Sequence, residues 1–174
     1  GGDGGVWILP CSSHVCSIPT SGAQVLTPPR DWRTVTAPKA DFVMQLGAKG
    51  VINRKKFNCW GQMPKVGTAE YKAWFSEVRR LGKAIWDITG KGVNVDMVFE
   101  HPGEATFPVS SLVCKKGGMV VICAGTTGFN CTFDVRYMWM HQKRLQGSHF
   151  AHLKQAAAAN KLMCERRLDP CMSE

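Results

Sequence analysis

The 174-residue sequence lacks any apolar run close to the roughly 20 residues that a helix needs to cross a bilayer. Its start also lacks the basic and then apolar order of a signal peptide. No internal repeat and no low-complexity tract is present. These absences exclude a membrane-spanning helical protein and a repeat protein. Because the first residue is not Met, we expect a fragment or an excised domain.

None of the eight cysteines stands in a CxxC pair, and several fall within expected strands or helices. A disulfide framework or a zinc site of paired cysteines would show shorter and more regular spacings. The pattern indicates reduced and mostly buried thiols in a cytoplasmic protein. His14 lies near Cys11 and Cys16, but these are too few ligands at an unfamiliar spacing, so no metal site is expected.

The formal net charge of +9 is compatible with binding to nucleic acid, a membrane surface or a phosphorylated small molecule. The basic residues form short groups, mostly at element ends, without the aromatic ladder of single-strand-binding surfaces. This arrangement favours a solvated basic surface with a phosphate-bearing ligand, rather than nucleic acid or membrane. A content of 44% hydrophobic and 20% charged residues fits a single domain with one core.

From about residue 34 onward, strand and helix signals alternate, which predicts an α/β fold with a mostly parallel sheet. Apolar residues at helical spacing predict a long helix between a capping Thr68 and Gly90. Nearly continuous apolar runs at 95–99 and 119–123 predict strands that are covered on both faces. Further helices are expected at 38–47, 104–113 and 152–166, and further strands at 50–53 and 144–148.

Three of the expected strands are followed by loops with ligand-binding residue types, which predicts a nucleotide-binding sheet. In an open α/β sheet, ligands bind beyond the carboxyl ends of the strands. Glycine allows close backbone approach, hydroxyls bond ribose or amide groups, and imidazole donates a hydrogen bond or shuttles a proton. Each residue alone is also a common loop residue, so the prediction depends on their convergence. They are His101, Gly125, Thr126, Thr127, Ser148 and His149.

Four segments resemble one known family: LGAKGVINR at 46–54, VFEHPG at 98–103, FDVRYMWM at 133–140 and LQGSHFA at 145–151. From Thr34 to Glu174 the chain strongly resembles the crotonyl-CoA carboxylase/reductases, which are zinc-independent medium-chain reductases. The resemblance implies a Rossmann-type fold and a partial NADP-binding domain over residues 1–174. It also implies that the family's GroES-like catalytic domain lies outside the chain.

The resemblance implies a reductive carboxylation that uses NADPH. In the family, hydride passes to the β-carbon of a 2-enoyl-CoA and CO2 adds at the α-carbon, which converts crotonyl-CoA into ethylmalonyl-CoA. His149 matches a histidine that helps to hold CO2 through water. Thr36 and Lys39 fall in the segment that holds the 2′-phosphate of NADPH, where an ammonium group suits a phosphate. Homo-oligomeric assembly is also implied.

Residues 1–33 depart from the family. Residues 6–9 can be laid on the family's first strand, but the Gly-rich turn that receives the pyrophosphate is missing. Because the length is kept while the pattern is lost, we hypothesise a local reading-frame slip or severe divergence. Two alternative functions therefore stay open: a non-carboxylating enoyl-CoA or quinone reductase, and a catalytically silent fragment that acts only in subunit packing.

Overall fold

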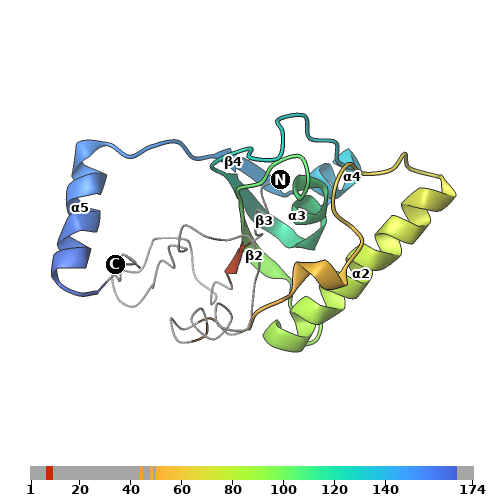
Figure 1. Cartoon of the computed structure of the whole chain (residues 1–174), viewed down its shortest axis with the longest axis horizontal. Coiled ribbons are helices and arrows are strands. Elements are labelled where there is room, and N and C mark those ends of the chain that lie inside the picture. Colours follow the sequence, from red (N-terminus) through yellow and green to blue (C-terminus); the bar gives the residue numbers. More distant parts are fainter. Residues whose placement is uncertain (1–6, 10–43, 45–47, 49, 168–174) are drawn as a thin grey trace. The chain divides into compact units, whose positions relative to one another are not determined.

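The computed structural model describes residues 7–9, 44, 48 and 50–167. The described residues fall into two units, and each is considered by itself. The first unit contains residues 7–9 and 52–148 and holds the sheet (Figure 1). The second contains the remaining described residues, including helix α5 (Leu153–Cys164). Thr36 and Lys39 lie outside the described residues, as does most of the helix expected at 38–47.

The first unit is built on a four-stranded sheet in the order β1-β2-β3-β4. The strands are β1 (Trp7–Leu9), β2 (Val95–Glu100), β3 (Cys114–Ile122) and β4 (Arg144–Gly147). The pairs β2/β3 and β3/β4 are parallel, which confirms the predicted mostly parallel sheet. Glu100 is aligned with Ile122, and Ile122 with Gly147, so β2, β3 and β4 end at one level.

Helix α2 (Ala69–Thr89) has the ends that the sequence predicts. The Thr68 side chain accepts a hydrogen bond from the Tyr71 backbone N–H at 3.2 Å, and Gly90 ends the helix with a φ of 112°. Glycine suits this end because a positive φ costs it no clash with a Cβ atom. The buried face joins the core and consists of Trp74, Val78, Leu81 and Ile85.

Helix α3 (Phe107–Val113) packs against β2, β3 and α2 (Figure 1). Its last turn is held by Lys143, whose buried ammonium donates to the carbonyls of Ser111 at 2.6 Å and Leu112 at 3.1 Å. A cation suits these carbonyls, which carry the negative end of the helix dipole. Burial lowers the pKa of Lys143 to about 8. Because Lys143 directly precedes β4, these bonds also tie the start of that strand to α3.

Three sequence predictions about helices and strands differ from the structure. Residues 50–53 form no strand and lead into the short 3-10 helix η1 (Arg54–Lys56), which Asn53 caps by accepting from the Lys55 N–H. Helix α3 starts at Phe107 rather than at residue 104, and residues 104–106 form a turn that precedes it. Strand β3 follows α3 directly, because it starts at Cys114 rather than at residue 119.

Strand β1 pairs antiparallel with β2, with Trp7 opposite Phe99. The segment that can be laid on the family's first strand therefore does contain a strand, and only its antiparallel direction departs from the otherwise parallel sheet. A three-residue strand has few side chains with which to specify its direction, so backbone pairing alone admits either orientation. In contrast, the predicted strand at 144–148 and the predicted helix at 152–166 are confirmed as β4 and α5.

Two other expectations concern membrane-spanning helices and the state of the cysteines. Within the described part of the chain, no helix is long and apolar enough to cross a membrane. The cysteines described there carry free thiols: Cys59 and Cys114 are buried, Cys123 and Cys131 are half-buried, and Cys164 is exposed. Burial raises the pKa of Cys59 to about 11, so this thiol is a core side chain rather than a nucleophile.

Candidate functional site

The loops after β2, β3 and β4 meet at one rim of the sheet, because the three strands end at the same level. The Cys123 N–H donates to the Glu100 carbonyl at 3.1 Å, and the Ser148 N–H donates to the Ile122 carbonyl at 2.7 Å. The first residue beyond each strand is therefore held beside its neighbour. This arrangement brings together the loops of His101, of residues 125–127 and of Ser148, as the sequence predicts.

Thr127 joins the β2 loop to the β3 loop. Its hydroxyl donates to the Pro102 carbonyl at 2.7 Å and accepts from the Ala105 N–H at 3.0 Å. Its own N–H also donates to the Pro102 carbonyl at 2.8 Å. The sequence singled out Thr127 as a ligand-binding hydroxyl, and in the structure this hydroxyl holds the two loops together.

Glycines 103 and 125 allow the two loops to touch. Gly103 has a φ of 84°, and a Cβ atom there would lie 2.6 Å from the Gly128 carbonyl oxygen and 3.0 Å from the Gly125 Cα. A Cβ atom at Gly125 would lie 2.8 Å from the ring of Phe129. That ring is 88% exposed, so it covers Gly125 while facing solvent. Both glycines are needed for packing at the rim.

His101, Thr126 and Ser148 present exposed polar groups at the rim. Within the described residues, no hydrogen bond uses the imidazole of His101 or the hydroxyls of Thr126 and Ser148. An imidazole and two hydroxyls supply both donors and acceptors, which suit a polar ligand such as an amide or a ribose. His149 follows Ser148 directly and belongs to the second unit, where its ring centroid lies 3.8 Å from that of Phe150.

Glu100 is a residue of this rim that sequence reasoning missed. Its side chain is completely buried beneath the β2 loop. The carboxyl group accepts hydrogen bonds from the Gly103 N–H and from the hydroxyls of Thr106 and Ser110. The only sequence signal for this role was the place of Glu100 at the end of an apolar strand, with the hydroxyl residues Thr106 and Ser110 after it. That pattern does not reveal whether the acid faces solvent or the loop.

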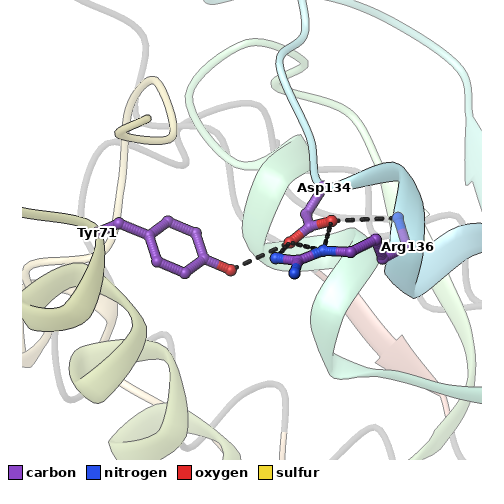
Figure 2. Close-up of polar contacts among 3 residues, drawn as sticks. All are labelled: Tyr71, Asp134 and Arg136. Carbon is purple, nitrogen blue, oxygen red and sulfur yellow. Dashed lines mark hydrogen bonds and ion pairs between the residues drawn. The ribbon is translucent and has the colours of Figure 1, made fainter. Parts of the chain in front are cut away.

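Asp134 forms a second buried carboxylate cluster, between α2 and the short helix α4 (Val135–Trp139) (Figure 2). It caps α4 by accepting from the Arg136 N–H at 3.1 Å. The Arg136 guanidinium donates to both of its oxygens, and the Tyr71 hydroxyl donates to Oδ2 at 3.2 Å. The hydrogen bonds from Arg136 lower the pKa of Asp134, whereas burial beside this carboxylate raises the pKa of Tyr71.

We expect Asp134→Asn to lower the free energy of unfolding by about 2–3 kcal/mol at neutral pH, since charge-assisted hydrogen bonds are lost from a buried site. The lowered pKa means that Asp134 contributes stability above its unfolded pKa of about 3.9, which is lost as pH falls. The difference between variant and parent should therefore shrink below about pH 4. Urea unfolding at a series of pH values measures this difference.

The matched control is Asp87→Asn, because Asp87 lies on the exposed face of α2. A change at such a surface carboxylate should stay within about 0.5 kcal/mol. A destabilisation by Asp134→Asn that remained constant from pH 7 to pH 3 would show that charge is irrelevant to this cluster.

No group of three or more His, Cys, Asp or Glu residues that could hold a metal ion occurs among residues 7–9, 44, 48 and 50–167. The exposed side chains at the rim are instead the imidazole of His101, the hydroxyls of Thr126 and Ser148 and the ring of Phe129.

Comparison with known proteins relates this fold to one family. Residues 34–164 match the family model described as zinc-binding dehydrogenase. A crotonyl-CoA carboxylase/reductase of Cereibacter sphaeroides is 85% identical over 136 residues, which are 78% of this chain and 32% of the relative. The chain thus spans about a third of the length of this curated relative.

Two solved structures are similar in fold. A crotonyl-CoA carboxylase/reductase superposes with a TM-score of 0.77 at 71% identity, over 79% of this chain and 32% of the other. The crotonyl-CoA carboxylase/reductase AntE in complex with NADP has a TM-score of 0.76 at 41% identity, over 79% of this chain and 34% of the other. A Rossmann-type domain, as expected from the sequence, is consistent with both.

Proposed function

Since the chain belongs to the zinc-binding dehydrogenase family, we propose that it forms the NADPH-binding part of a crotonyl-CoA carboxylase/reductase. The observation that carries the proposal is the polar rim beyond three parallel strands, in a chain that is 85% identical over 136 residues to a relative of that name. A similar chain, AntE, was crystallised with NADP, which supports the choice of cofactor.

The residues at the rim fit a nicotinamide dinucleotide. His101, Thr126 and Ser148 offer exposed hydrogen-bonding groups that suit the amide and ribose groups of such a ligand. The position beyond the carboxyl ends of the strands is where open α/β sheets bind such ligands. Thr36 and Lys39 are proposed to hold the 2′-phosphate, which pairs a hydroxyl and an ammonium with phosphate oxygens.

The chemistry that NADPH supplies when bound is hydride transfer to the β-carbon of crotonyl-CoA, with CO2 added at the α-carbon to give ethylmalonyl-CoA. In this scheme His101, Thr126 and Ser148 orient the carboxamide end of the cofactor. His149 is proposed to hold CO2 through a water molecule, because imidazole both donates and accepts hydrogen bonds. The CoA substrate would supply the phosphate groups that suit a chain of net charge +9.

A fluorescence titration of this chain with NADPH and with NADH tests the cofactor. We expect a saturable change in tryptophan fluorescence with NADPH and at least about tenfold weaker binding of NADH, since one phosphate contact is worth about 1.4 kcal/mol or more. Lys39→Gln should weaken NADPH binding and leave NADH binding unchanged. No saturable change with either nucleotide would overturn the proposed function and favour a catalytically silent fragment.

The carboxylation step is tested by product mass. The protein is incubated with crotonyl-CoA and NADPH, with and without bicarbonate. A carboxylated product is expected only where bicarbonate is present. A saturated acyl-CoA of unchanged mass in both samples would indicate a non-carboxylating enoyl-CoA reductase.

Homo-oligomeric assembly and a cytoplasmic location are proposed with the same function. All four residues of β4 are exposed, and among the described strands β4 lies at the edge of the sheet. Edge strands with open backbone groups are commonly paired or covered in native proteins, which supports assembly through this domain. Reduced thiols at the described cysteines are compatible with a reducing compartment.

A further inference from the structure

Glu100 is a buried acid without a basic partner. Its side chain has no exposure to solvent, and none of the ion pairs in the described part of the chain includes it. A buried carboxyl group is costly unless hydrogen bonds replace the water that it has lost. Its retention at the end of β2 therefore requires donors from the surrounding protein.

Those donors come from a single stretch of chain, the loop after β2 and the start of α3. The Gly103 N–H donates to Oε1 at 3.0 Å, and the Thr106 hydroxyl donates to the same oxygen at 2.5 Å. The Ser110 hydroxyl donates to Oε2. Thr106 is the N-cap residue of α3, yet its hydroxyl makes no capping bond because it is turned to Glu100. The loop is thus wrapped around the carboxyl group.

The same loop is the one that carries His101 and touches the β3 loop. The bonds of Thr127 to Pro102 and Ala105 join the two loops, and Gly103 packs on Gly125. A displacement of the loop around Glu100 would consequently move His101 and disturb the loop of Thr126. The buried acid is therefore connected to the exposed rim through short and specific contacts.

We propose that Glu100 is a positioning residue for the dinucleotide, whose three accepted hydrogen bonds hold the His101 and Thr126 loops in the binding geometry. This inference rests on the proposed function, because it concerns the same rim. Glu100 itself touches no ligand, since it is fully buried. Hydrogen-bond acceptance, rather than negative charge, is the property required, because all three partners are neutral donors.

Three variants of the chain separate positioning from a loss of stability. Glu100→Ala removes all three acceptors, whereas Glu100→Gln keeps an oxygen for Gly103 and Thr106 and offers an amide N–H to the Ser110 oxygen. Ser111→Ala is the matched control, because it removes a buried hydrogen bond to the Pro108 carbonyl inside α3 and touches neither loop. If Glu100→Ala fails to fold, Thr106→Val removes one of the three hydrogen bonds, and valine has nearly the same shape as threonine.

Each variant is measured by NADPH titration and by amide hydrogen exchange of residues 101–106, which requires no cofactor. We expect Glu100→Ala to weaken NADPH binding by about tenfold and to speed exchange in this loop by about tenfold or more. Thr106→Val should cause a smaller change in the same direction. Glu100→Gln should restore both properties to within about threefold, and Ser111→Ala should leave both unchanged.

Unchanged exchange in the loop of Glu100→Ala would overturn the positioning role, whether or not the parent chain binds NADPH. If the parent chain binds no NADPH while Glu100→Ala speeds exchange in the loop, Glu100 remains the anchor of the loop. The proposed function is then rejected instead. Equal losses of binding in Glu100→Ala and Ser111→Ala would also contradict the inference, because they would reflect general destabilisation.

Discussion

Gly103→Ala is expected to lower the free energy of unfolding by about 2–5 kcal/mol, the sum of a left-handed backbone penalty and an overpacking penalty. The left-handed φ of 84° disfavours any Cβ atom, and the added carbon would lie 2.6 Å from the Gly128 carbonyl oxygen. Backbone on both sides of the contact cannot rotate away as a side chain could. Chemical denaturation in urea measures the change.

The matched control for this prediction is Gly67→Ala. Gly67 has a φ of 94°, but a Cβ atom there would meet nothing within 4 Å. It should therefore show the backbone penalty alone, about 1–2 kcal/mol. A Gly103 variant no less stable than the Gly67 variant would show that the contact between the β2 and β3 loops contributes little. If the rim binds NADPH as proposed, Gly103→Ala should also weaken that binding, because the loops must separate.

His149→Ala is expected to lower the ratio of carboxylated to merely reduced product by about 100-fold, in protein that turns over crotonyl-CoA with NADPH and bicarbonate. Removing a single polar group that holds a reacting species costs about this much in other enzymes. Reduction without carboxylation should continue, because hydride transfer to the β-carbon requires no bound CO2. Product masses measured at saturating bicarbonate report the ratio directly.

His152→Ser is the control for this second prediction. His152 lies three residues further on and caps α5, where its ring accepts from the Gln155 N–H at 3.4 Å. Serine is a strong N-cap residue, so the helix should be retained and the product ratio should not change. An unchanged ratio in His149→Ala would remove His149 from the proposed site, although NADPH binding at the rim would still stand.

Elements with strong local signals were predictable from the sequence. Thr68 and Gly90 bracket α2 as expected, because capping and the apolar period of a helix depend on residues within a few positions of each other. The level ends of β2, β3 and β4 follow from the alternation of strands and helices, which favours parallel pairing. Two of the expected site residues, His101 and Thr126, are accordingly exposed on neighbouring loops.

Roles that depend on distant partners were not predictable. Thr127 and Thr126 have the same chemistry in sequence, yet the hydroxyl of Thr127 binds the β2 loop while Thr126 is exposed. The cap of α4 by Asp134 is local, but its bond to Tyr71 joins residues 63 positions apart. Spacing along the chain carries no information about such pairs.

The amino-acid sequence by itself determined the mostly parallel α/β pattern, the long capped helix and the set of polar loops beyond the strands, because each depends on short-range periodicity and turn chemistry. The tertiary structure alone decided the antiparallel direction of β1 and the burial of Glu100 beneath the His101 loop. It also decided that Thr127 holds two loops together. The direction of β1 and the role of Thr127 arise from contacts between segments far apart in the chain. The burial of Glu100 arises from the way the following loop and α3 pack over the strand end, because buried polar groups must be satisfied.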